Sequence, residues 1–487
     1  MERIDRRELI KLAGVSAMAL SDPSITNVEP KSSAPLNVLI LKSDEHNPKY
    51  SSVYGHPFIH TPNMERLAKH GTVFENHYCP SPLCRPSRSA FMSGLRVHQN
   101  QAYSNCNIFT SDLPTYGGVL NEQGVHTVHI GKTDVYRESG SLGFSEMILP
   151  WDRPKPGDIN ISRKPLAIRT GDGDERSKGF GLVEGDPFTD DRKLVSAAID
   201  WLNTRAPVLG KPWTMEVNIG KPHFPHMVTK ELWDMYAEHA DLPKHGKEAE
   251  SANHPYTLDL RAHFETDKTT ESQIRGLRRG YYGCVTFVDS QLGRLLDALE
   301  KTGLSKNTIL AYTSDHGEML GKFGMWWKCS LYEDSVRVPL IVAGPGFKRN
   351  HRVKTPVDQM DFQASIFKSL RAKRPAQWVG QPLQRIATND KRRIVFSEYH
   401  GHGTRAGAYV IRKDKWKLIY YRLAPHQLFD LETDPDELVN LAEKLPDRLF
   451  EMEMDLRGIC FPEEEDRLAE ETIQRQLKAI RQAGYKV

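Results

Sequence analysis

The sequence predicts an α/β fold: a large, mostly parallel central sheet flanked by helices, plus a smaller C-terminal α+β subdomain with a short antiparallel sheet. Up to about residue 385, short apolar runs that stop at polar residues alternate with amphipathic segments. This alternation is typical of buried parallel strands joined by helices. Beyond that point several short apolar runs follow one another directly, which is typical of antiparallel strands.

In the larger part, each expected strand is an apolar run with polar residues at its end. The first runs from Asn37 to Leu41 and stops at Ser43-Asp44-Glu45, and the run at 308–313 stops at Ser314-Asp315-His316 in the same way. Further strands are expected at 73–77, 125–131, 212–219 and 339–342. Helices are expected at 62–70, with Thr61 as the N-cap and Gly71 at the end, and at 86–93, 193–203 and 274–301.

The C-terminal part has a different pattern of short runs. Strands are expected at 394–398, 409–412, 416–421 and 428–430, with a hairpin across Lys413-Asp414. Helices are expected at about 446–457 and 465–482. The chain is therefore divided into residues 1–35, a catalytic α/β domain at 36–384 and a C-terminal subdomain at 385–487.

The first 35 residues resemble an export signal and a linker. Arg6-Arg7 precedes a short, weakly apolar stretch from Leu12 to Leu20, and a Ser-, Pro- and Asn-rich segment follows. The pattern predicts twin-arginine export of a folded bacterial protein, and hence a periplasmic or secreted location. The alternative is a basic N-terminus with a chance Arg-Arg pair, because no clear Ala-x-Ala cleavage site follows.

Composition excludes several classes of protein. The 66 Lys and Arg against 63 Asp and Glu leave a net charge of +3, which lacks the strongly basic footprint of a nucleic-acid binder. No apolar run is long enough to predict a membrane span. Six cysteines in 487 residues do not make a disulfide scaffold. The sequence leaves the oligomeric state open.

Two sets of polar residues follow expected strands. Ligands in parallel sheets bind at the carboxyl ends of the strands. Because Asp44 and Asp315 both follow such ends, one site can hold both.

The most distinctive local feature is Cys84-Arg85-Pro86-Ser87-Arg88. A cysteine at a helix N-terminus is favoured as a thiolate by the helix dipole, and Pro86 suits the first helical turn. Taken alone, the segment fits either a reactive thiol or a buried structural cysteine.

This Cys-x-Pro-Ser-Arg segment resembles the signature of the type I sulfatases, in which the cysteine is oxidised to formylglycine. Other segments resemble motifs of that family in the same order: Asn37 to Asp44, Thr61 to Ala68, Gly131-Lys132, Lys221-Pro222-His223-Phe224-Pro225, Ser314-Asp315-His316-Gly317-Glu318 and Lys328-x-x-x-Tyr332-Glu333. The resemblance covers about residues 36–460. It implies an alkaline-phosphatase-like sandwich, a sulfuric ester hydrolase and maturation by a formylglycine-generating enzyme.

The resemblance implies a divalent-cation site at the modified Cys84. Asp44 and Asp315 supply hard oxygen donors and His316 an imidazole, so Ca²⁺ is expected, with Mg²⁺ or Mn²⁺ as alternatives. Glu45 stands where many sulfatases have a second Asp, and is either a further ligand or a solvent-facing neighbour.

The resemblance also implies a mechanism. The aldehyde at position 84 is hydrated to a gem-diol, one hydroxyl of which attacks sulfur. Lys132 and Lys328 are expected to bind the sulfate, Arg88 to hold the gem-diol and metal ligands, and His223 to act as general acid. Many sulfatases read Gly-Lys-Trp-His where this chain has Gly131-Lys132-Thr133-Asp134, so either Asp134 or another group is the base.

The Gly-Lys-x-Asp segment, Asn253-His254-Pro255 and Ser397-Glu398-Tyr399-His400-Gly401 resemble the branch that contains arylsulfatase K, a uronate-2-sulfatase. This implies a uronic acid 2-O-sulfate of a polysaccharide or oligosaccharide as substrate. His254 would contact it, and His400, His402 and Arg405 would line the outer pocket, where a carboxylate needs a cation. Two alternatives remain: a phosphonate monoester hydrolase or phosphodiesterase of the same superfamily, and an inactive carbohydrate-binding relative.

Overall fold

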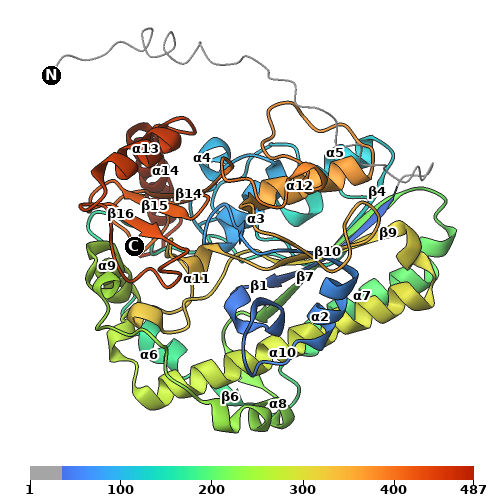
Figure 1. Cartoon of the computed structure of the whole chain (residues 1–487), viewed down its shortest axis with the longest axis horizontal. Helices are drawn as coiled ribbons and strands as arrows, with labels where there is room; N and C mark the ends of the chain where they lie inside the picture. Colours follow the sequence, from blue (N-terminus) through green and yellow to red (C-terminus); the bar gives the residue numbers. More distant parts are fainter. Residues whose placement is uncertain (1–35, 487) are drawn as a thin grey trace. The chain divides into compact units, whose positions relative to one another are not determined.

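An eight-stranded sheet runs through residues 36–486, which are the residues that the computed structural model describes (Figure 1). The strand order is β11-β2-β10-β9-β1-β7-β4-β5. The bounds are β1 (Asn37–Asp44), β2 (Gly71–Phe74), β4 (His126–Lys132), β5 (Glu146–Trp151), β7 (Trp213–Pro222), β9 (Thr308–Ser314), β10 (Leu340–Ala343) and β11 (His351–Val353). The predicted twin-arginine signal at residues 1–35 lies outside the described residues.

The sheet is mostly parallel, as predicted. β1 pairs in parallel with β7 and β9, and β4 does so with β7 and β5. β10 alone among these strands is antiparallel to both its neighbours, β9 and β2. The mixed α/β class expected from the alternating pattern is therefore confirmed.

Helices cover both faces of this sheet (Figure 1). Along β1, Leu39 and Leu41 pack into one core cluster and Val38 and Ile40 into another, because successive side chains of a strand point to opposite faces. The first face is covered by α2 (Pro62–His70), α7 (Thr189–Thr204) and α10 (Glu271–Lys301). The second is covered by α3 (Cys84–Ser93), α5 (Tyr116–Glu122) and α12 (Gln359–Ser369).

A separate four-stranded antiparallel sheet follows, also as predicted. It consists of β13 (Ile394–Tyr399), β14 (Ala408–Lys413), β15 (Trp416–Tyr421) and β16 (Gln427–Asp430). One face packs Phe396, Ile411 and Leu418 against α13 (Pro446–Arg457), and the chain ends in α14 (Pro462–Gln482). The other face, which includes Tyr399 and Ile419, shares a core with Tyr256 and Tyr332 of the larger part.

The remaining α-helices and strands are short. They are α4 (Val97–Asn100), α6 (Asp172–Ser177), α8 (Lys230–Met235), α9 (Pro255–Phe264), α11 (Glu333–Val336), β3 (His77–Tyr78), β6 (Phe180–Leu182), β8 (His226–Val228) and β12 (Val357–Asp358). Within residues 36–486, no helix combines the length and the apolar character that crossing a bilayer requires.

The predicted bounds of α2 are confirmed, with Thr61 at the N-cap position and Gly71 at the C-cap, but the helix is capped differently than expected. The hydroxyl of Thr61 makes no cap hydrogen bond and instead accepts one from the backbone N–H of Ser52. The Asp289 carboxylate on α10 accepts from the backbone N–H groups of Asn63 and Met64, so a distant residue caps the helix. Gly71 has extended backbone and begins β2, because the chain passes directly from helix to strand.

Candidate active site

Four neighbouring strands bring the candidate residues to one edge of the sheet. In the order β9, β1, β7 and β4, these strands are all parallel, so their carboxyl ends align. Asp315 follows β9, Asp44 ends β1, Asn218 lies near the end of β7 and Lys132 ends β4. Gly131 permits this alignment, because a Cβ on it would lie 2.3 Å from the carbonyl oxygen of Asn218.

Cys84 is the first residue of α3 and is fully buried. Its Sγ lies 3.2 Å from Nε2 of His316. Burial opposes ionisation, but the charges of Lys132 and Lys328 outweigh it and lower the pKa of the Cys84 thiol. The cysteine therefore stands at a helix N-terminus between two lysines, where a developing negative charge is stabilised.

Arg88 ties three strands together one helical turn after Cys84. Its Nε donates to Oδ2 of Asp315 at 2.8 Å, and its two other nitrogens donate to Oδ1 of Asn218 at 2.8 Å and to Oδ2 of Asp44 at 3.3 Å. All four side chains are buried. Arg88 therefore fixes both aspartates relative to Cys84.

The four groups at this edge suit a divalent cation. Asp44, Cys84, Asp315 and His316 each offer a ligand atom, and these atoms lie within 4.8 Å of one another. Oδ1 of Asp44 is buried without a hydrogen-bond partner among the described residues. A buried carboxylate oxygen needs a donor or a cation, and carboxylate donors favour hard cations. The donor set therefore fits the metal that the sequence predicts.

The negative charges around His316 raise the pKa of its imidazole. Burial opposes its protonation, but Asp315 and Cys84 raise its pKa to about 9. Metal binding requires a neutral imidazole and releases such a proton.

Glu45 lies beside this group but faces the lysine. Its Oε2 is 3.0 Å from Nζ of Lys328 and 3.3 Å from Nε2 of His223. Burial raises the pKa of the Glu45 carboxyl well above its ordinary value, although Lys328 opposes the shift. Glu45 is a buried residue with a left-handed backbone, not a solvent-facing neighbour. Its role as a metal ligand stays a prediction.

Lys132 and Asp134 lie on the other side of Asp44. Nζ of Lys132 donates to Oδ2 of Asp44 and lies 3.7 Å from Oδ2 of Asp134. Burial opposes ionisation of Asp134, but Arg153 and Lys132 hold its pKa at about 2. Asp134 is thus a paired carboxylate at neutral pH, in contact with the guanidinium of Arg153 at 3.0 Å.

His223 and Lys328 form a close pair. Nζ of Lys328 donates to Nε2 of His223 at 2.6 Å, and Nδ1 of His223 is 2.7 Å from the carbonyl oxygen of Phe224. Burial and the neighbouring Lys328 charge hold the pKa of His223 well below its ordinary value. His223 is therefore a neutral acceptor of the lysine proton.

His254, expected to contact the substrate, and the three residues expected in the outer pocket lie in different places. Nδ1 of His402 is 3.0 Å from Oδ2 of Asp158, and its Nε2 is 3.4 Å from Sγ of Cys329, next to Lys328. His400 is buried against Glu398, with 2.9 Å between Nε2 and Oε2. Nε2 of His254 is 2.9 Å from the carbonyl oxygen of Pro425. Only His402 is brought next to a residue of the catalytic group.

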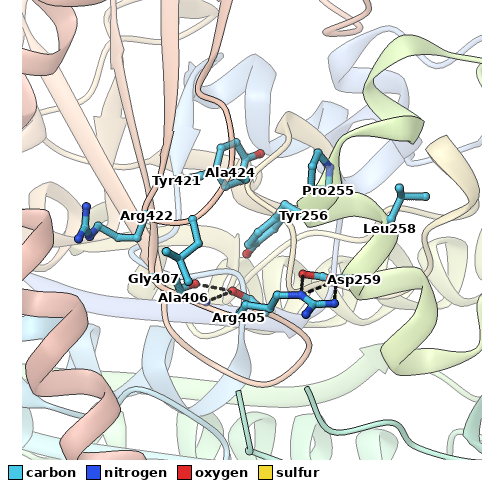
Figure 2. Close-up of a pocket in the computed structure, with 12 residues that line it drawn as sticks. Pro255, Tyr256, Leu258, Asp259, Arg405, Ala406, Gly407, Tyr421, Arg422 and Ala424 are labelled. Atoms are coloured by element: carbon cyan, nitrogen blue, oxygen red, sulfur yellow. Dashed lines mark hydrogen bonds and ion pairs between the residues drawn. The ribbon is translucent and has the colours of Figure 1, made fainter. Parts of the chain in front are cut away.

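Arg405 lies on the surface, where it makes a bidentate salt bridge with Asp259 (Figure 2). Both side chains line a pocket of about 440 Å³ between α9 and the loops that follow β13 and β15. None of the residues that line this pocket belongs to the group around Cys84. The structure therefore separates Arg405 from the catalytic group.

Sequence reasoning missed two residues, Asn218 and Arg176. Asn218 bonds to Arg88, and its signal is a polar residue within the apolar run of β7. Arg176 lies in α6, with Cζ 4.6 Å from the ring centroid of Phe224 and 4.8 Å from that of Trp327. These rings adjoin His223 and Lys328 in the chain. The charged sequence around Arg176 resembles an ordinary exposed helix and carries no signal of this position.

Family profiles and curated proteins match most of this chain. The sulfatase family profile matches residues 36–371, and a profile described as the C-terminal part of N-sulphoglucosamine sulphohydrolase matches residues 321–457. The choline-sulfatase of Rhizobium meliloti (strain 1021) is 32% identical over 84% of this chain and 82% of that protein. Arylsulfatase K of Xenopus laevis is 28% identical over 90% of this chain and 84% of that protein.

Solved structures share the fold. A phosphonate monoester hydrolase of Agrobacterium radiobacter superposes with a TM-score of 0.70 at 22% identity, covering 87% of this chain and 95% of that one. A 2-O GAG sulfatase superposes with a TM-score of 0.67 at 23% identity, covering 87% and 92%. At this level of identity the likeness is one of architecture.

Proposed function

This chain belongs to the sulfatase family and is a sulfuric ester hydrolase, and we propose that its substrate is a uronic acid 2-O-sulfate of a polysaccharide or oligosaccharide. The single observation that carries the assignment as a sulfate ester hydrolase is the buried group of side chains at the strand ends. There Asp44, Cys84, Asp315 and His316 converge within 4.8 Å, and Lys132 and Lys328 stand on either side.

Sulfatases generally use a formylglycine and a divalent metal, and the residues here fit both. We propose that Cys84 becomes the formylglycine and that Asp44, Asp315 and His316 hold Ca²⁺, with Glu45 as a further candidate. Bound together, these groups supply a hydrated-aldehyde nucleophile and a Lewis acid. Asp44 Oδ1, buried without a hydrogen-bond partner among the described residues, supports a cation at this place.

The side chains around Cys84 have separate tasks. Lys132 and Lys328 supply fixed positive charges for the sulfate oxygens, where charge develops in the transition state. Arg88 keeps Asp44 and Asp315 in place. His223 accepts a hydrogen bond from Lys328, and this pair would protonate the leaving oxygen. Asp134 is ionised and bonded to Arg153, and its service as a base requires that this pair open.

The substrate class is supported by relatives. Arylsulfatase K is similar along most of the chain, one structural neighbour is titled a 2-O GAG sulfatase, and another is a protein in complex with its substrate D-glucosamine-2-N,6-O-disulfate. The choline-sulfatase of Rhizobium meliloti points to a different alcohol, so choline sulfate belongs in every substrate test. The phosphonate hydrolase neighbour makes phosphodiesters the rival substrates.

The proposal includes maturation and location. A formylglycine-generating enzyme would convert Cys84, and the twin arginines would export the folded chain to the periplasm or beyond. All six cysteines are free thiols in the structure, so the fold of residues 36–486 does not depend on a disulfide.

The test compares initial rates on a uronic acid 2-sulfate, choline sulfate, 4-nitrophenyl sulfate and bis(4-nitrophenyl) phosphate, with the mass of the Cys84 peptide measured in parallel. We expect the uronate to be the best substrate, and Cys84→Ala to lose at least about a thousandfold in kcat/KM, because the nucleophile is gone. Cys284→Ala, a buried cysteine on α10, is the matched control and should keep its activity. Chelation should abolish turnover and Ca²⁺ restore it. Dominant phosphodiester turnover, or full activity of Cys84→Ala, would refute the proposal.

A further inference from the structure

Arg176 is a partly buried cation at the side of the site where His223 and Lys328 lie. Its guanidinium carbon is 4.6 Å from the ring centroid of Phe224, 4.8 Å from that of Trp327 and 5.6 Å from that of Phe264. The Phe224 ring stacks on His223, with 4.2 Å between centroids. Arg176 is therefore one aromatic ring away from the His223–Lys328 pair.

Few carboxylates lie near the partly buried charge of Arg176. Its side chain is 20% exposed and is 3.0 Å from Asp172, a carboxylate that Arg169 also approaches at 3.8 Å. Asp158 is already paired with Arg169 and His402. Burial and the nearby positive charge of Arg169 lower the pKa of Arg176, although Asp172 opposes the shift. A buried arginine with one shared carboxylate partner gains from a further anion.

The same contacts argue against a cationic substrate. A quaternary ammonium group is held by the faces of aromatic rings. Arg176 already lies against Phe224 and Trp327, and Nζ of Lys328 is 4.9 Å from the Phe224 centroid. A choline head group brought to these rings would meet two positive charges instead of open aromatic faces.

We propose that Arg176 binds a second anionic group of the substrate, the carboxylate of the uronic acid, and selects against cationic alcohols. This assignment rests on the proposed function and deepens it. It moves the carboxylate partner from Arg405, which is paired with Asp259 on the surface, to a residue beside the catalytic group.

The test uses a matched pair of substrates, a uronic acid 2-sulfate and its carboxyl-reduced hexose 2-sulfate, with 4-nitrophenyl sulfate and choline sulfate as references. The variants are Arg176→Gln and Arg176→Lys. Arg192→Gln is the control, because Arg192, on α7, also lies over two phenylalanine rings and pairs with a single aspartate, Asp186.

A charged hydrogen bond is worth about 1.5–3 kcal/mol, so Arg176→Gln should lose about 10- to 150-fold in kcat/KM on the uronate, mainly through KM. Turnover of the reduced hexose and of 4-nitrophenyl sulfate should stay within about threefold, which also shows that the variant is folded. Choline sulfate should improve relative to the uronate. Arg176→Lys should recover part of the uronate activity, because lysine keeps the positive charge but cannot bond a carboxylate through two nitrogens as a guanidinium does.

Each other outcome has a definite meaning. If the wild type hydrolyses both members of the pair equally, or if Arg176→Gln loses both equally, the role of Arg176 is refuted while the sulfatase activity stands. If the wild type hydrolyses 4-nitrophenyl sulfate but neither member of the pair, the uronate substrate is refuted and this role with it.

Discussion

At the scale of single residues, His223 and Lys328 act as one unit. The lysine ammonium donates to the imidazole, and burial together with that charge keeps the pKa of His223 low. The sequence predicted His223 as the general acid and Lys328 as a separate sulfate-binding residue. In the structure the Lys328 ammonium donates to the imidazole, so we expect the pair, and not His223 alone, to protonate the leaving oxygen.

This pairing predicts a dependence on the leaving group. His223→Gln should lower kcat by about 100-fold or more on an alkyl sulfate, whose alkoxide must be protonated as it departs. The same variant should change turnover of 4-nitrophenyl sulfate by less than about threefold, because nitrophenolate leaves as a stable anion. Steady-state kinetics on both substrates would measure the difference. His239→Gln is the control, since His239 also stacks on a phenylalanine, Phe58. Equal losses on both substrates would contradict the role.

The candidate site residues that the structure brings together are those with fixed spacing in short motifs. Cys84 and Arg88 are one helical turn apart, Asp44 ends one strand and Asp315 follows another, so local pattern suffices to bring them to one edge. Arg176 and Arg405 show the limit. Which arginine lies near His223 depends on how the 152–182 segment and the loop after β13 pack, and no local pattern records that.

At the scale of elements, β1 shows how a charged residue is buried in a sheet. The predicted strand ends at Leu41, but the structure continues it through Lys42 to Asp44. Nζ of Lys42 is 2.5 Å from Oε1 of Glu216 on the neighbouring β7, and both side chains are buried. Tyr116 also donates to Glu216. A polar residue at position 42 looked like the end of the strand because its partner lies in a distant segment.

Protonation of Glu216 should lower the stability of the fold at acid pH. Burial opposes its ionisation, but Lys42 and His129 lower its pKa to about 2, from an ordinary value of 4.5. A depressed folded-state pKa contributes stability above about pH 4.5, and that contribution is lost as the pH falls toward 2. Between pH 5 and 3, wild type should therefore lose about 2 kcal/mol more stability than Glu216→Gln, and about 3 kcal/mol more once the carboxyl is fully protonated below pH 2.

At neutral pH the variant should be the less stable protein. Glu216→Gln leaves the Lys42 ammonium buried without a carboxylate, which should destabilise the fold by about 3–5 kcal/mol. Urea unfolding midpoints from pH 3 to 7 measure both effects. Glu471→Gln, which removes an exposed partner of Arg467, should shift stability by less than about 1 kcal/mol. Parallel stability curves for Glu216→Gln and wild type would show that the pair does not titrate as argued.

Most of the long elements were predictable, and the short ones were not. β7, β9 and α10 have long apolar or amphipathic patterns, so their existence and type followed from the sequence. β6, β8, β11 and β12 have two or three residues each and exist only because a partner strand is present. The cap of α2 by Asp289 likewise comes from tertiary packing.

At the scale of the whole described chain, the C-terminal sheet completes the core of the larger part. Tyr399, Val410 and Ile419 pack in the same cluster as Tyr256 and Tyr332. Nζ of Lys417 on β15 bonds to Glu333 of α11 at 2.9 Å and to Glu437 at 2.7 Å, and all three side chains are buried. The C-terminal profile match, residues 321–457, also crosses the boundary at 384/385 that the sequence predicted.

These contacts predict that a chain ending at residue 384 does not fold. Removal of the C-terminal sheet exposes the apolar face around Tyr256 and Tyr332 and leaves Glu333 buried without Lys417 or Arg412. In the full chain, Lys417→Met should destabilise by about 3–5 kcal/mol, because the buried carboxylates of Glu333 and Glu437 lose their shortest ion pairs and keep only longer ones, such as those to Arg412 and Lys322. Lys413→Met, which breaks a partly exposed pair with Asp455, should cost less than about 1 kcal/mol.

Soluble yield, circular dichroism and denaturant titration of the truncated chain and of both variants measure this directly. In Lys417→Met, activity and the far-ultraviolet signal should be lost in one transition, because Glu333 lies five residues after Lys328 and both parts share a core. A truncated chain that unfolds cooperatively would instead establish 384/385 as a true domain boundary. Separate transitions for activity and secondary structure would mean that the C-terminal sheet opens without disturbing the strand ends that hold Asp44 and Asp315.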